Sequence, residues 1–199
     1  VSFETAEQRI FALADYVVTG QGDVTFNKLA RALLHGPRPL MKVHVGGEFE
    51  LDSLQLPYEY YSDEDIARRH LYVEASRGCP FKCEFCLSAL DKTALPFDTA
   101  RFLIEMSKLY DRGARTFKFV DRTFNLNVKT SQAILEFFLE RIEAKPYDPC
   151  FAHFELVPDH LPDKLKATIA KFPAGTLQFE IGIQTWNPTV QGHISRKQN

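Results

Sequence analysis

Three of the chain's four cysteines lie within eight positions, and no other feature of the sequence restricts its fold and chemistry as strongly. Cys79, Cys83 and Cys86 follow the spacing C-x3-C-x2-C. Gly78 and Pro80 interrupt regular structure on either side of Cys79. The spacing therefore predicts a loop, and a loop can turn three sulfurs toward one point.

Three converging thiolates need a partner. A structural zinc site takes four ligands, usually as two close pairs, and Cys150 stands alone further along the chain. Disulfides would leave one of the three cysteines unpaired, and the chain does not have the pattern of a small secreted scaffold. A closed iron–sulfur cluster takes four thiolates, so three would leave one iron open to another ligand. The residues favour such a cluster, with a zinc knuckle or unreacted thiols as the alternative.

The segment Arg77–Cys86 resembles the cluster loop of the radical S-adenosylmethionine superfamily. Phe85 supplies the aromatic residue that precedes the third cysteine in that family. The resemblance implies a [4Fe-4S] cluster on Cys79, Cys83 and Cys86, with S-adenosylmethionine bound to the open iron near Phe85. It also implies reductive cleavage to a 5′-deoxyadenosyl radical, with an external electron donor such as flavodoxin or ferredoxin.

Length and charge exclude other classes of protein. The chain has 199 residues and a net charge of −2. This charge argues against a groove that binds nucleic acid by bulk electrostatics. No apolar run approaches 18 residues, so no membrane partner is expected. The segment that begins at Val1 does not have the pattern of a signal peptide. Together with the free thiols, this favours a location in the cytoplasm. The first residue and the ending at 195–199 are typical of a fragment of a longer protein.

Residues 1–35 form the first segment. The sequence predicts a helix over 4–14, a strand over 15–20, a turn over 21–23 and a helix over 24–34. This unit resembles the closing segment of a doubly wound cobalamin-binding domain, although Gln21 replaces an acidic residue of that family's turn. The resemblance implies cobalamin in the longer protein; the alternative is a simple αβα cap.

Residues 36–70 are interpreted as a linker punctuated by glycine and proline. Residues 41–45 and 49–51 predict a hairpin around Gly46 and Gly47. The aromatic stretch 56–61 is expected to be extended and to pack against the following domain, with substrate stacking as the alternative.

Residues 71–199 alternate between strands and helices. Four βα units in a row predict a parallel sheet with right-handed crossovers. With the cysteine loop after the first strand, they predict the front four units of a partial TIM-type barrel in an α/β fold, whose active residues lie at carboxyl strand ends. The expected strands are 71–76, 116–120, 150–156 and 177–183, and the expected helices are 98–110, 130–143, 162–172 and 188–196.

Polar residues near the ends of these strands are the remaining site candidates. Asp121 follows the second strand, and the resemblance implies that it accepts from the amino group of S-adenosylmethionine. Glu155 shares a face of the third strand with His153, and is a candidate contact for S-adenosylmethionine or substrate. Gln184 and Arg196 resemble a family pattern that contacts the ribose or carboxylate of S-adenosylmethionine, with Glu180 as a weaker companion. Trp186 is expected to pack beneath its loop, and Cys150 to be a small core residue.

The sequence thus predicts a radical S-adenosylmethionine enzyme domain whose substrate is unknown. Cobalamin-assisted methyl transfer is one reaction that such a domain would catalyse. The alternative is a non-catalytic iron–sulfur or zinc module for electron transfer or structure. An electron carrier normally closes its cluster with a fourth cysteine, and that difference separates the two hypotheses.

Overall fold

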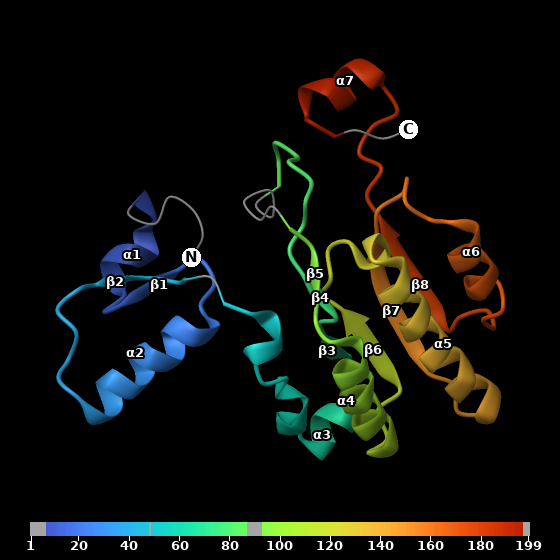
Figure 1. The fold of residues 1–199 in the computed structure, drawn as a ribbon, viewed down its shortest axis with the longest axis horizontal. Coiled ribbons are helices and arrows are strands. Elements are labelled where there is room, and N and C mark those ends of the chain that lie inside the picture. The colour runs from blue at the N-terminus through green and yellow to red at the C-terminus, as the bar shows by residue number, and fades with distance from the viewer. Residues whose placement is uncertain (1–6, 48, 87–92, 197–199) are drawn as a thin grey trace. The chain divides into compact units, whose positions relative to one another are not determined.

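The computed structural model describes residues 7–47, 49–86 and 93–196, and it divides at Leu54 into two compact units (Figure 1). In the first unit a short helix α1 (Arg9–Leu13) precedes β1 (Val17–Thr19), α2 (Asp23–His35) and β2 (Val43–Val45). β1 and β2 pair in parallel, with Val17 opposite Val43. The predicted hairpin is therefore wrong. Residues 43–45 return beside β1 through α2, because strands that pair in parallel need a crossover and cannot be joined by a tight turn.

The second unit is built on a parallel sheet. Its four strands, β3 (Leu71–Val73), β6 (Thr116–Phe119), β7 (Phe151–Leu156) and β8 (Leu177–Ile181), are ordered β3-β6-β7-β8. The α/β fold and the sequential parallel strands predicted from the sequence are confirmed. In Figure 1 the carboxyl ends of these strands point toward the top of the view.

Helices cover one face of this sheet. Figure 1 shows α4 (Thr99–Asp111), α5 (Val128–Ala144) and α6 (Asp163–Ile169) along it, while α7 (Pro188–His193) lies beyond the strand ends. Side-chain caps fix where two helices begin: the Asp98 carboxylate accepts from the Arg101 amide at 2.7 Å, and the Asn127 side chain accepts from the Thr130 amide. In the described part of the chain, no helix is both long and apolar enough to cross a membrane.

Phenylalanines make the core between the sheet and these helices. The ring centroids of Phe119 and Phe154 are 4.4 Å apart, and those of Phe117 and Phe138 are 5.1 Å apart in an edge-on contact. All four side chains are fully buried, and each contributes about 2 kcal/mol of hydrophobic stabilisation. Cys150 is 2% exposed, which confirms it as a core residue, whereas Trp186 is 80% exposed and does not pack beneath its loop.

The aromatic stretch before the sheet protects the open edge of β3. Residues 57–60 form a 3₁₀ helix, η3 (Pro57–Tyr60), rather than the predicted extended segment, and α3 (Asp63–Arg68) follows. The Tyr61 hydroxyl accepts from the Tyr72 amide at 3.0 Å and donates to the Tyr72 carbonyl at 2.8 Å. Tyr58 bonds the amide and carbonyl of Glu74 in the same way. Two hydroxyls thus satisfy backbone groups that a further strand would otherwise pair with.

Replacing either tyrosine with phenylalanine is expected to weaken this edge. Tyr58→Phe leaves two part-buried backbone groups of Glu74 without their side-chain partner and should cost about 1–3 kcal/mol of unfolding free energy, with a smaller loss for Tyr61→Phe. Urea unfolding followed by circular dichroism measures both. Tyr60→Phe is the control, because the Tyr60 side chain is 76% exposed and should change stability by less than about 0.5 kcal/mol. Equal midpoints for all three variants would contradict the edge-protection role.

Candidate functional site

The cysteine loop leaves the carboxyl end of β3 through a short antiparallel ladder. β4 (Ser76–Arg77) pairs with β5 (Leu95–Pro96), so the loop between them is tied together at its base. Gly78 has φ +98°, and a Cβ built on it would lie 1.9 Å from the carbonyl oxygen of Thr93. The backbone on the two sides of the loop is therefore too close for any side chain at this position.

The three cysteines line one cavity at the carboxyl ends of the strands. The predicted residues Phe85, Glu155, Gln184 and Arg196 line the same cavity. The structure thus brings together side chains from the cysteine loop, from β7 and from the segment after β8. Residues not singled out from the sequence complete the wall: Phe81, Arg122, Thr123, Leu156, Val157, Pro158, Asp159 and Gly182.

The thiols of this cavity are free and partly or fully buried. Cys79 and Cys83 are buried and Cys86 is half-buried. Burial raises the pKa of the Cys79 thiol, while a hydrogen bond from the Phe81 backbone and the charge of Arg196 act in the opposite direction. A group with this pKa is protonated at neutral pH, so a metal would have to displace the proton on binding.

The cysteines do not form a site for a single metal ion. Among the residues that the structure describes, no three Cys, His, Asp or Glu side chains are grouped so that they could hold one ion. A four-iron cluster makes a different demand, because each thiolate binds a different iron and the three sulfurs surround a larger body. Three thiols around one cavity are the number that a cluster with one open iron requires.

The fourth cysteine lies at the other end of the sheet. Cys150 immediately precedes β7, whereas Leu156, the last residue of that six-residue strand, lines the cavity. A strand of this length spans about 20 Å. Cys150 therefore cannot close a cluster held by the three loop cysteines.

Charged side chains from the sheet face the same cavity. His153 and Glu155 lie on one side of β7, as the alternation predicted, while Ala152, Phe154 and Leu156 are buried on the other. Arg122 contacts the Glu155 carboxylate at 3.3 Å. Glu180 stands opposite Glu155 in the β7–β8 register, and its carboxylate lies 3.7 Å from His153 Nε2.

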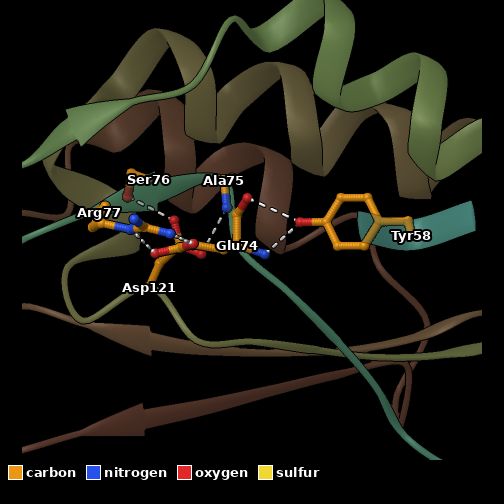
Figure 2. Close-up of polar contacts among 6 residues, drawn as sticks. All are labelled: Tyr58, Glu74, Ala75, Ser76, Arg77 and Asp121. Carbon is orange, nitrogen blue, oxygen red and sulfur yellow. Dashed lines mark hydrogen bonds and ion pairs between the residues drawn. The ribbon is translucent and has the colours of Figure 1, made fainter. Parts of the chain in front are cut away.

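Asp121 is buried and forms hydrogen bonds with residues 75 and 76, just before the cysteine loop (Figure 2). It is 1% exposed, and its carboxylate accepts from the Ala75 amide at 3.0 Å and the Ser76 hydroxyl at 2.6 Å. Beside it, Arg77 and Glu74 form an ion pair at 2.7 Å. These bonds fix residues 74–77, from which the cysteine loop departs. The expected contact of Asp121 with the amino group of S-adenosylmethionine stays a prediction, and Asp121 is not among the residues lining the cavity.

Ionisation of Asp121 should make stability depend on pH. Burial raises its pKa from 3.8 to about 6, against the bonds from Ser76 and Ala75. Between these two values the folded chain binds a proton that the unfolded chain does not, so stability falls as pH rises from about 4 to about 6. A shift of this size corresponds to about 3 kcal/mol.

Asp121→Asn removes this titration while retaining groups that can bond Ala75 and Ser76. Relative to the parent protein, the variant should gain about 3 kcal/mol between pH 4 and pH 7, measured as urea midpoints across that range. Asp148→Asn is a control of opposite sign. Arg115 holds the pKa of Asp148 below its usual range, so this variant should lose stability at neutral pH and not at low pH. Parallel pH profiles for the parent and Asp121→Asn would contradict the role assigned to burial.

Gln184 occupies a constrained position in the cavity wall. Its φ of +67° lies in the left-handed region, which costs a residue other than glycine on the order of 1 kcal/mol. Such conformations persist where the surrounding structure imposes them, and they cluster at functional sites. The conformation therefore agrees with Gln184 as a site residue.

Comparison with known proteins places this geometry in context. No protein-family model matches the chain. An uncharacterized methyltransferase of Pyrococcus horikoshii is 33% identical, with 58% of this chain and 30% of that protein covered. Another, from Synechocystis, is 28% identical, with 62% and 23% covered. The chain therefore spans less than a third of the length of these curated relatives.

Solved structures give the fold. The radical S-adenosylmethionine methyltransferase TsrM of Kitasatospora setae, with tryptophan and a SAM analogue bound, matches with a TM-score of 0.51 at 18% identity, over 61% of this chain and 23% of TsrM. A second structure of TsrM, with cobalamin and a [4Fe-4S] cluster, matches equally well over 62% and 24%. Over the matched part, the chain therefore shares the fold of TsrM. The resemblance inferred from the cysteine loop is confirmed.

Within this fold, Asn125 has a positioning role that the sequence did not identify. The Asn125 side chain is fully buried, donates to the Val157 carbonyl at 2.8 Å and accepts from the Val157 amide at 2.8 Å. It thereby fixes the turn after β7 that forms one wall of the cavity. Its position a few residues after β6 was the only signal in the sequence, and that position does not separate a positioning residue from a turn residue.

Proposed function

We propose that this chain is the cofactor-binding part of a radical S-adenosylmethionine methyltransferase. One observation carries the proposal: Cys79, Cys83 and Cys86 line a single cavity at the carboxyl ends of a parallel sheet, together with Glu155, Gln184 and Arg196. Active sites of related barrels occupy this end of the strands. The likeness to TsrM and the methyltransferase relatives agree with the proposal.

The cysteines would hold a [4Fe-4S] cluster through three thiolates, because Cys150 is too far away to supply a fourth. When bound, such a cluster would supply one electron and one open iron for the binding and reductive cleavage of S-adenosylmethionine. Glu155, Glu180 and Asp159 place carboxylates around the cavity, which suits the positive sulfonium and amino groups. Phe81 and Phe85 provide apolar wall for the remainder of the ligand and exclude water.

The rest of the assembly follows from the same proposal. The four strands would be the front of a partial barrel, to which later strands add at the free edge of β8 because the tyrosine hydroxyls occupy the edge of β3. The unit β1–α2–β2 would be the last part of a cobalamin-binding domain, and the linker expected over 36–70 would then begin only after β2. An electron donor of the flavodoxin or ferredoxin kind would supply the electron, and the protein would work in a reducing, cytoplasmic setting. The methyl acceptor is left open by this proposal.

Anaerobic reconstitution tests the proposal. The chain incubated with iron and sulfide should bind about four irons and show the electron paramagnetic resonance signal of a reduced cluster that changes on addition of S-adenosylmethionine. With a reductant, products from S-adenosylmethionine should be 5′-deoxyadenosine, or S-adenosylhomocysteine if cobalamin is added and methylated. A chain that binds one zinc and no iron would instead identify the non-catalytic module.

A further inference from the structure

The segment that follows α7 bonds directly to the cysteine loop. The Glu84 amide donates to the Ile194 carbonyl at 3.2 Å, and the Ser195 hydroxyl donates to the Glu84 carboxylate at 2.8 Å. Ser195 has φ +53°, in the left-handed region. We call residues 194–196 the clasp. A strained residue held by contacts on both sides is typical of a segment whose position matters for function.

Arg196 extends the clasp to a cysteine sulfur. Its Nη1 donates to Cys83 Sγ at 3.6 Å, and its Nη2 donates to the Gly182 carbonyl just after β8. Cys83 is 5% exposed. One guanidinium therefore joins the cysteine loop to the end of the sheet, and both of its terminal nitrogens have partners within the chain.

We propose that Arg196 is a positioning residue for the cluster: it holds the Cys83 thiolate in place and neutralises part of its charge. The inference rests on the proposed function and goes beyond the contact with S-adenosylmethionine that the resemblance implied. A buried thiolate is costly unless a charged donor accompanies it, and arginine keeps its charge at all relevant pH values. Hydrogen bonds to cluster sulfurs are among the factors that set a cluster's reduction potential.

The sign of the effect follows from charge. Reduction adds a negative charge to the cluster, and a cation donating to one of its sulfurs stabilises that reduced form. Removal of the Arg196 guanidinium should therefore shift the midpoint potential to a more negative value. The shift should be present before any S-adenosylmethionine is added, because the contact with Cys83 needs no ligand.

The test is a redox titration of the reconstituted full chain without S-adenosylmethionine, followed by electron paramagnetic resonance. Arg196→Gln should bind iron more weakly and show the more negative potential, and Arg196→Lys should lie between it and the parent protein. Arg115→Gln is the matched control. Arg115 carries the same charge, but it precedes β6 at the opposite end of the sheet, does not line the cavity and pairs with Asp148 at 2.7 Å, so its removal should leave the potential unchanged.

Binding of S-adenosylmethionine, measured by calorimetry on the same samples, separates the alternatives. Weaker binding with an unchanged ligand-free potential in Arg196→Gln would assign Arg196 to the ligand and overturn the proposal. If Arg196→Gln fails to fold, Ser195→Ala tests the proposal in its place. This substitution removes the bond to Glu84, and the variant should release iron to a chelator faster than the parent protein does. Parent-like iron release in Ser195→Ala and a parent-like potential in Arg196→Lys would then overturn the proposal that the clasp positions the cluster. Failure of the parent protein to bind iron would instead contradict the proposed function.

Discussion

Cys83→Ala is expected to abolish cluster binding, with iron falling from about four per chain to near zero after anaerobic reconstitution. Cys83 is one of three thiols around the cavity, and with two thiolates remaining the cluster would lose a third of its protein ligands. The same substitution removes one of the two partners of the Arg196 guanidinium. Iron and sulfide analysis together with the visible absorbance of the cluster measures the loss.

Cys150→Ala is the matched control for this result. It removes a thiol of the same chemistry from a buried position before β7, so it should cost on the order of 1 kcal/mol of stability and leave iron content unchanged. Cys79→Ala and Cys86→Ala should behave like Cys83→Ala. Iron loss in Cys150→Ala with a native circular dichroism spectrum would show that the fourth cysteine is a ligand and would contradict the three-thiolate site.

The pattern of strands and helices after residue 70 could be predicted because it depends on local signals. Asp98 caps α4 and buried apolar residues alternate along β6 and β7, and these preferences agree with the final packing. The hairpin over 41–51 failed because its turn glycines gave no information on strand direction. β2 pairs with β1, which lies more than twenty residues earlier in the sequence, and no local signal specifies that pairing.

In the candidate site too, local signals could be predicted and long-range contacts could not. The cysteines were predicted from their spacing, Glu155 from its place on a strand, and Gln184 and Arg196 from a resemblance, and all of them do meet around one cavity. The partner of each side chain could not be predicted, because it depends on distances between segments far apart in sequence. The Arg196–Cys83 and Asp121–Ser76 contacts are of this kind. Two tyrosine hydroxyls on the edge of β3 likewise require the folded geometry of η3.

Gly78→Ala is expected to displace the cysteine loop while the rest of the sheet stays folded. The added methyl carbon would lie 1.9 Å from the Thr93 carbonyl oxygen, far inside contact distance, and φ is +98°. The backbone conformation and the clash together should cost about 2–4 kcal/mol. Since β4 and β5 pair at this point, the simplest relaxation is to open their ladder. Iron binding should therefore fall at least tenfold in chelator competition, because 1.4 kcal/mol lost from the loop already corresponds to that factor.

Gly113→Ala separates the clash from the backbone conformation. Gly113 has φ +103°, almost the same as Gly78, but no described atom lies within 4 Å of a Cβ built on it. It should lose on the order of 1 kcal/mol and bind iron like the parent protein. If the two variants lose equal stability and both keep their iron, close approach to Thr93 does not position the loop. A loss of iron confined to Gly78→Ala would show that the cysteines depend on the ladder at the base of their loop, and that the sheet alone does not place them.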